Sequence, residues 1–181
     1  MTERVTRPML GGPMSFLRFA TLEDLPALFE STEACLRDGR GMVEGPGECS
    51  LEAYTEQMAV YVAPNVPGSS ALFVVEVGGF ARGHVMVRRL RPSYVRHVGV
   101  LGLEVHPEAQ GKGHGRALVQ RAISWSRKVG VERLELSVRA DNPRAIGLYE
   151  ACGFARESCR PRFVKLPDGA YVDDFTFAMR L

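Results

Sequence analysis

The chain has 181 residues, of which 45% are hydrophobic and 24% charged, and its formal net charge at pH 7 is +2. This length suits one domain, because two smaller cores would each be marginally stable. The composition is that of an ordinary globular protein, the small charge argues against a nucleic-acid partner, and no apolar run approaches the ~20 residues of a membrane-spanning helix.

The chain has four cysteines: Cys35, Cys49, Cys152 and Cys159. They form no C-x-x-C pair and no zinc-finger spacing, so we expect reduced thiols, a cytoplasmic protein and no metal site. Residues 1–14 lack the apolar segment of a secretory signal. We expect them to be a flexible extension, with Met14 as an alternative native start, and residues 15–181 to form a single domain.

The expected elements, in chain order, are a strand at 16–19, a helix containing 25–36, a helix at 51–62, strands at 71–77, 81–90 and 94–105, a helix at 113–129, a strand at 132–138, a helix after Asn142, and strands at 154–165 and 171–180. Thr21 and Ser50 are placed to cap the first two helices. Gly78 and Gly79 mark a hairpin between two β-rich runs. This order predicts an α/β fold in which helices cover a mixed sheet.

A glycine-rich turn joins the strand that ends at Val105 to the helix at 113–129. Its residues are Gln110, Gly111, Lys112, Gly113, His114, Gly115 and Arg116. Alternate glycines let the main chain approach a bulky anion, and the first N–H groups of a helix favour phosphate. Lys112 and Arg116 add positive charge. The turn therefore predicts a pyrophosphate site, and a tight connection without a ligand is the alternative.

Two common phosphate-binding motifs do not match this turn, which limits the ligands that it could bind. No Gly-Lys-Ser or Gly-Lys-Thr of a P-loop occurs. The dinucleotide fingerprint G-x-G-x-x-G matches at Gly111 and Gly113, but Arg116 takes its third glycine position. That fingerprint also belongs on the first strand of a parallel sheet, whereas about 100 residues precede it here. An enzyme that uses a nicotinamide dinucleotide is therefore a less favoured hypothesis.

A second segment combines a strand, a turn and a capped helix. Asn142 is placed as the N-cap, with Pro143 at the first helical position. Tyr149 lies two helical turns after Asn142, so the two share a face with Ala145 between them. This row suits a thin ligand arm, although Asn142 capping the helix and Tyr149 packing in the core would explain it equally well.

Together the two segments resemble the motifs of the GNAT superfamily of acetyl-CoA-dependent N-acetyltransferases. The first resembles motif A, [QR]-x-x-G-x-[GA], through Gln110, Gly113 and Gly115. The second resembles motif B, D-N-x-x-A-x-x-L-Y-x-x-x-G-F, through Asp141, Asn142, Ala145, Leu148, Tyr149, Gly153 and Phe154. The resemblance covers about residues 16–181, and residues 169–174 are similar to the branch of bacterial protein and amino-acid N-acetyltransferases.

The resemblance implies a mostly antiparallel sheet, splayed between its fourth and fifth strands, with acetyl-CoA in the gap. The implied coenzyme-binding residues are Leu103, Val105, Gln110, Gly111, Lys112, Gly113, His114, Gly115, Arg116, Asn142, Ala145 and Tyr149. Main-chain groups of Leu103 and Val105 would bind the pantetheine arm, and the N–H groups of residues 111–116 would hold the pyrophosphate.

For catalysis we expect direct attack of an amine on the thioester. Tyr149 is the candidate acid for the departing thiolate. Strand alternation turns Glu104 away from Leu103 and Val105, so it either faces the acceptor as the base or is a structural carboxylate. His97 and His106 are weaker candidate bases.

The expected partner is a small-molecule amine or a protein amino group, with no nucleic acid and no membrane. The segment from Asp24 to Val62 should form one wall of the acceptor pocket, and the final strands are a candidate homodimer surface. A non-catalytic acyl-CoA-binding sensor on the same fold is the alternative to the N-acetyltransferase.

Overall fold

The computed structural model describes residues 5–7, 15–39, 43–64 and 66–181, with only the backbone of residues 5–7. Most of the predicted N-terminal extension lies outside these residues. Within it, Val5–Arg7 forms strand β1, which the sequence analysis did not predict, and pairs antiparallel with β2 (Ser15–Phe19).

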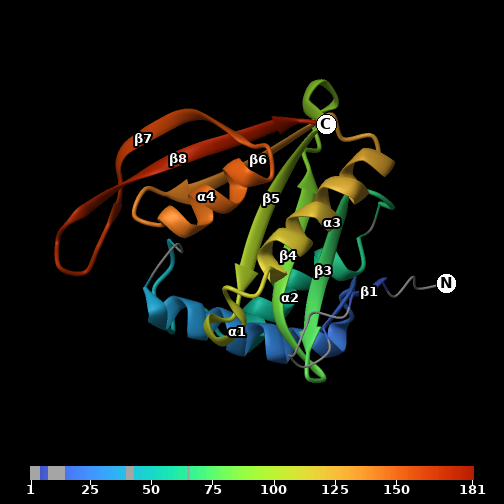
Figure 1. Cartoon of the computed structure of the whole chain (residues 1–181), viewed down its shortest axis with the longest axis horizontal. Helices are drawn as coiled ribbons and strands as arrows, with labels where there is room; N and C mark the ends of the chain where they lie inside the picture. Colours follow the sequence, from blue (N-terminus) through green and yellow to red (C-terminus); the bar gives the residue numbers. More distant parts are fainter. Residues whose placement is uncertain (1–4, 8–14, 40–42, 65) are drawn as a thin grey trace.

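The core of the fold is an eight-stranded sheet with the order β1-β2-β3-β4-β5-β6-β8-β7 (Figure 1). The remaining strands are β3 (Ser70–Val77), β4 (Phe80–Arg89), β5 (Val98–Val105), β6 (Arg133–Arg139), β7 (Ala155–Lys165) and β8 (Tyr171–Arg180). Every neighbouring pair is antiparallel except β5 and β6, which are parallel. The prediction of a mixed, mostly antiparallel sheet is therefore confirmed.

The β5–β6 pair holds together over only a short stretch. Val98–Val100 pair with Arg133–Glu135, and no pairing follows although both strands continue. The two strands lie together at one end and separate toward the other (Figure 1). The splay falls between the fourth and fifth of the predicted strands, as expected, and leaves one edge of β5 open inside the sheet.

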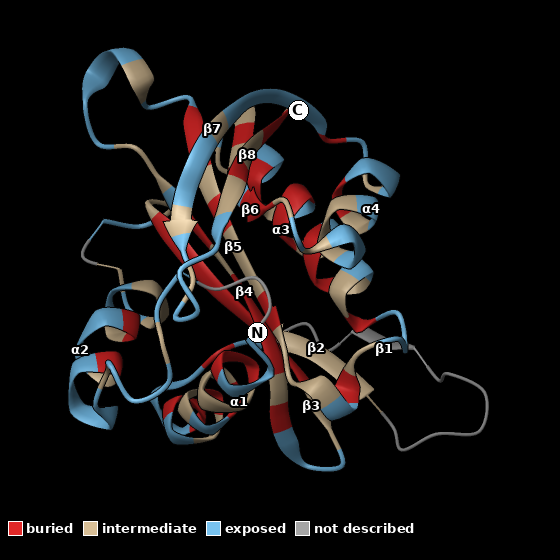
Figure 2. Ribbon diagram, turned by 90° about the vertical axis from the view of Figure 1, so that its left-hand side faces the viewer, coloured by how far each residue is buried: buried red, intermediate tan, exposed pale blue. Residues whose placement is uncertain are grey.

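Helices cover both faces of this sheet. α1 (Leu25–Asp38) and α2 (Leu51–Val62) lie on one side, and α3 (His114–Lys128) and α4 (Pro143–Ala151) lie on the other (Figure 2). Alternating residues of β3 enter two separate cores: Phe73 packs in the cluster that contains Leu118 of α3, and Leu72 packs in the cluster that contains Leu28 of α1. The sheet thus separates two hydrophobic cores.

Two helix starts test the predicted caps. Ser50 accepts a hydrogen bond from the Ala53 N–H at 3.2 Å and caps α2, whose bounds match the prediction. Thr21 is also an N-cap, but of a 3-10 turn over Leu22–Asp24 that runs directly into α1, so the α-helix itself starts one turn later than predicted. Asp24 accepts the Thr21 N–H at 2.7 Å and also pairs with Arg18, so its carboxylate closes the 3-10 turn and joins it to β2.

The strand predicted at 94–105 is also shorter than expected. β5 begins at Val98, and Ser93–Val95 form a 3-10 turn instead. Pro92 starts this turn, and Tyr94 is 94% exposed, so no sheet neighbour covers it. The hairpin at Gly78 and Gly79 is confirmed: both glycines have positive φ, 60° and 87°, between β3 and β4.

Candidate active site

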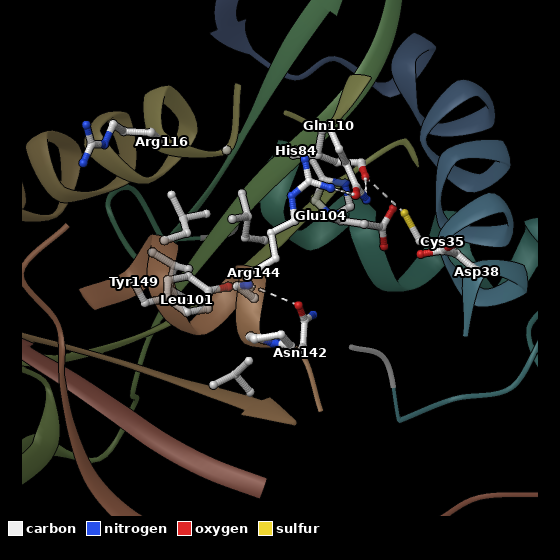
Figure 3. Close-up of a pocket in the computed structure, with 18 of the residues that line it drawn as sticks. Cys35, Asp38, His84, Leu101, Glu104, Gln110, Arg116, Asn142, Arg144 and Tyr149 are labelled. Carbon is white, nitrogen blue, oxygen red and sulfur yellow. Dashed lines mark hydrogen bonds between the residues drawn. The ribbon is translucent and has the colours of Figure 1, made fainter. Parts of the chain in front are cut away.

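A cavity of about 820 Å³ occupies the gap between β5 and β6. Its lining comprises Cys35, Asp38, His84, Met86, residues 101–105, Gln110, Gly111, Gly113, Gly115, Arg116, Ser137, Val138, residues 141–145, Leu148 and Tyr149. We call the lining from the glycine turn, β6 and α4 the turn side. The lining from α1 and β4, together with Glu104, is the α1 side (Figure 3). The cavity therefore connects the two faces of the sheet.

The open edge of β5 presents main-chain groups to this cavity. Val98 accepts the Leu90 N–H at 2.9 Å, and the His106 N–H donates to the Arg82 carbonyl at 2.9 Å. Even-numbered residues of β5 thus bond to β4, and by strand alternation Leu103 and Val105 direct their N–H and C=O groups into the gap. Such an edge can accept an extended ligand as an added strand.

The Val105 carbonyl is already occupied. It accepts a hydrogen bond from Gln110 Nε2 at 2.9 Å and another from Cys35 Sγ at 3.3 Å. The two donors come from the turn side and from α1, so they fix the end of β5 from both faces. The N–H of Val105 is left as the main-chain group for a ligand at this position.

The glycine turn has a backbone that requires glycine. Gly111 and Gly113 have φ of 76° and 82°, in the left-handed region, and Gly113 immediately precedes α3. The first intrahelical bond runs from the Ala117 N–H to the Gly113 carbonyl at 3.1 Å, so the preceding N–H groups have no helical acceptor. A Cβ at Gly115 would lie 3.1 Å from Leu148, because α3 and α4 approach closely there. This is the geometry of a phosphate site at a helix N-terminus.

The cations around the turn differ from those expected. Lys112 Nζ donates to the Glu108 carbonyl at 2.8 Å, and neither Lys112 nor the buried His114 lines the cavity. Arg116 does line it, as does Arg144, whose Nη1 donates to Gln110 Oε1 at 2.6 Å. Arg144 was not assigned a role from the sequence, although it directly follows the capped Asn142-Pro143 start of α4.

On α4, Asn142 Oδ1 accepts the Ala145 N–H at 3.1 Å, so its side chain caps the helix while the residue also lines the cavity. Tyr149 is buried, with its ring edge against Phe154. Burial raises the pKa of Tyr149, so its hydroxyl keeps the proton at neutral pH. Within the described part of the chain this hydroxyl has no hydrogen-bond partner, which leaves it available to a ligand.

The α1 side contains a carboxylate and a histidine from adjacent strands. Glu104 is directly opposite His84 in the β4–β5 register, and both are more than 90% buried. Burial raises the pKa of Glu104 to about 7, so the carboxyl is partly ionised at neutral pH. Burial lowers the pKa of His84 to about 4, so its ring is neutral there, and its Nδ1 has no partner among the described residues.

His84 was not predicted from the sequence, because only the register of β4 against β5 places it beside Glu104. The two histidines that the sequence analysis did consider, His97 and His106, lie outside the lining. His106 Nδ1 instead accepts the Glu108 N–H at 3.2 Å and closes the turn after β5.

The His, Cys, Asp and Glu side chains of the described residues include no group of three placed to bind a metal ion. None of the described helices is both long enough and apolar enough to span a membrane.

Comparison with known proteins places the chain in a family. The profile of the Acetyltransferase (GNAT) family matches residues 40–154, which is more than half of the chain. The chain belongs to the GNAT acetyltransferase family. The match spans the glycine turn and α4, the two segments on which the resemblance was based.

Individual relatives match this GNAT protein over shorter stretches. Spermidine N(1)-acetyltransferase of Vibrio cholerae is 34% identical over 73 residues, which cover 40% of this chain and 42% of that one. The [ribosomal protein bS18]-alanine N-acetyltransferase of Escherichia coli is 40% identical over 70 residues, covering 39% and 47%. Each match thus covers less than half of the relative.

Among solved structures, the GNAT phosphinothricin acetyltransferase of Sinorhizobium meliloti, in complex with acetyl-CoA, superposes with a TM-score of 0.82. The superposition covers 92% of this chain and 88% of that one, at 20% sequence identity. At that identity the likeness supports the fold alone.

Proposed function

We propose that this GNAT protein is an acetyl-CoA-dependent N-acetyltransferase. The observation that carries the proposal is the cavity between β5 and β6, with a helix N-terminus suited to phosphate on the turn side and an ionisable carboxyl on the α1 side. A coenzyme thioester and an amine can therefore enter from opposite faces of the sheet and meet in the gap.

Acetyl-CoA would be bound mainly by main-chain groups. The N–H groups of residues 111–116 would hold the pyrophosphate, with Arg116 and Arg144 beside it. The pantetheine arm would pair with the open edge at Leu103 and Val105 and run past Asn142 and Ala145. The coenzyme supplies the activated acetyl group, and the protein holds its carbonyl in the gap.

The chain's own groups would then perform the acid–base steps. A primary amine is mostly protonated at neutral pH, and Glu104 would accept its proton. The free amine would form a C–N bond to the acetyl carbon while the Val105 N–H stabilises the oxyanion. The C–S bond would break as Tyr149 donates its hydroxyl proton to the departing sulfur, and the second proton that the nitrogen loses on forming the amide would restore the Tyr149 hydroxyl.

The acceptor would be a small-molecule amine or a protein amino group. Both kinds occur among the relatives, in the spermidine and ribosomal-protein acetyltransferases. Acidic residues of the α1 side support a cationic acceptor, since Asp38 lines the cavity and Glu44 is close enough to raise the pKa of Glu104.

The test is to mix the protein with acetyl-CoA and a panel that includes spermidine, amino acids and peptides with free N-termini. Release of free coenzyme A thiol that depends on one of the amines is the expected result. Tight acetyl-CoA binding without thiol release for any amine would contradict the proposal and support a non-catalytic acyl-CoA sensor.

A further inference from the structure

Helix α1 contacts the end of β5 through two side chains. Thr32 Oγ1 lies 2.9 Å from Glu104 Oε1, and Cys35 Sγ donates to the Val105 carbonyl at 3.3 Å. Positions three apart on a helix share a face, so one face of α1 contacts both Glu104, the proposed base, and Val105, the proposed oxyanion donor. Glu104 is thereby connected to a helix as well as to its own strand.

The direction of these hydrogen bonds follows from the groups present. An ionised carboxylate can only accept, so the single hydroxyl proton of Thr32 is donated to Glu104. The Thr32 oxygen lies 3.4 Å from the hydroxyl of Tyr54 on α2, and that contact must then run from Tyr54 to Thr32. Tyr54 is buried, and its ring packs against Phe29 at 5.5 Å. A chain of donors therefore runs from Tyr54 through Thr32 to Glu104.

The other groups around Glu104 do not duplicate this contact. Burial raises the pKa of Cys35 to about 12, so its thiol is neutral, and its proton is directed at the Val105 carbonyl. His84 is neutral as well. Glu44 is acidic and disfavours a charge on Glu104. Among the described residues, no other group donates a hydrogen bond to the Glu104 carboxylate.

We propose that Thr32, supported by Tyr54, is the positioning residue for Glu104: its hydroxyl orients the carboxylate and favours its ionised form. This role for Thr32 rests on the proposed function, in which Glu104 is the base that accepts the proton of the amine. Burial and the charge of Glu44 disfavour the ionised carboxylate, and the Thr32 hydrogen bond opposes both effects. Without that bond Glu104 would be more fully protonated at neutral pH and a poorer base.

The proposal predicts a change at Glu104 when only the Thr32 hydroxyl is removed. Thr32→Val keeps the shape of the side chain and should raise the pKa of Glu104 by about one pH unit or more, because hydrogen bonds to charged groups are worth at least that much. Thr32→Ser keeps the donor and should leave the pKa near 7. Tyr54→Phe should give a smaller rise, since it removes only the second donor in the chain.

The measurement is a 13C NMR titration of the glutamate side-chain carboxyl carbons in the full chain, with the Glu104 signal assigned through Glu104→Gln. Thr32→Ala is the second hydroxyl-free variant, should Thr32→Val not fold. Thr55→Val on α2 is the matched control and should leave the pKa of Glu104 unchanged. An unchanged pKa in the hydroxyl-free variant, or an equal rise in Thr32→Ser, would overturn the proposal.

This titration needs neither acetyl-CoA nor an amine, so it separates two kinds of failure. If the amine panel releases no thiol but removal of the hydroxyl still raises the pKa of Glu104, the proposed function fails and the positioning contact stands. If an amine is acetylated but the pKa of Glu104 does not respond to Thr32, the role of Thr32 fails and the proposed function stands.

Discussion

The turn side and the α1 side of the cavity are built in different ways. The turn side consists largely of main-chain N–H groups, positive-φ glycines and a helix cap, all within residues 101–149. The α1 side includes buried side chains from separate elements, with Cys35 on α1, His84 on β4 and Glu104 on β5, and Thr32 of α1 supports Glu104 from behind the lining. Two neighbouring surfaces of one cavity thus depend on backbone conformation in one case and on side-chain contacts in the other.

Because the two sides are built differently, different substitutions should impair them. A binding surface of N–H groups has no side chain to remove, so it is sensitive to the conformation of its glycines. An acid–base group instead depends on burial and hydrogen bonding, so it is sensitive to single polar atoms and to pH. Changes on the turn side should therefore affect coenzyme binding, and changes on the α1 side should affect turnover.

The largest effect is expected at Gly113. A Gly113→Val side chain would be strained at a φ of 82° and would distort the N–H groups at the start of α3. We expect acetyl-CoA affinity to fall by about 100-fold or more, measured by calorimetry, while circular dichroism shows a folded protein. Gly130→Val is the matched control, because Gly130 has a φ of 76° after the far end of α3. Normal binding by Gly113→Val would remove the turn from the coenzyme site.

The next effect is on the α1 side. Glu104→Gln keeps the shape and the acceptor oxygen for Thr32 but removes the base, so turnover should fall by about 100-fold or more. The dissociation constant for acetyl-CoA should stay the same, since Glu104 is away from the glycine turn. In the unmodified protein, kcat/KM should rise with pH through about 7 as Glu104 ionises. Equal turnover in the Gln variant would show that Glu104 is a structural carboxylate.

The same substitution should alter the pH dependence of stability. Folded Glu104 has a pKa of about 7, above its ordinary value of 4.5, so between these values the folded state retains a proton that the unfolded state has lost. Stability should therefore fall as pH rises from 4.5 to 7, by ~3 kcal/mol from this group. Urea unfolding at pH 5 and pH 8 should show a smaller fall for Glu104→Gln. An identical fall in both proteins would mean that Glu104 is not buried as the structure describes.

The smallest effect is expected at Tyr149, where the two sides meet. Tyr149→Phe removes only the hydroxyl, which has no partner among the described residues, so the fold should be retained. Turnover should drop by about tenfold, because the thiolate then leaves without its acid. Coenzyme affinity should hardly change, since the main-chain contacts remain. Unchanged turnover would remove Tyr149 from the acid role.

The same contrast explains what the sequence could predict. The glycine turn and the Asn142 cap lie in contiguous motifs, and their positive φ values and cap follow from local rules. Glu104 was found because strand alternation fixes its side. Thr32 is 72 positions from Glu104, and His84 lies beside Glu104 because of the register of β4 against β5. Neither contact therefore has a signature in the local sequence.

The predicted starts of two elements differ from the structure because tertiary contacts outweigh the local preferences of the sequence there. The start of β5 was misplaced because Tyr94 has a strand-forming side chain but lies exposed in a turn. The predicted cap at Thr21 is an N-cap, but it lies one 3-10 turn before α1, where the Asp24 carboxylate binds both Thr21 and Arg18 of β2. The general order of elements was nevertheless correct, since periodicity and glycine positions determine it.

The central claim is that the gap between β5 and β6 binds acetyl-CoA through main-chain N–H groups of the glycine turn. A crystal structure grown with saturating acetyl-CoA tests it most directly. We expect the pyrophosphate on the N–H groups of residues 111–116 and the thioester between Tyr149 and Glu104. Coenzyme bound outside the gap, or a turn left empty at saturation, would contradict it.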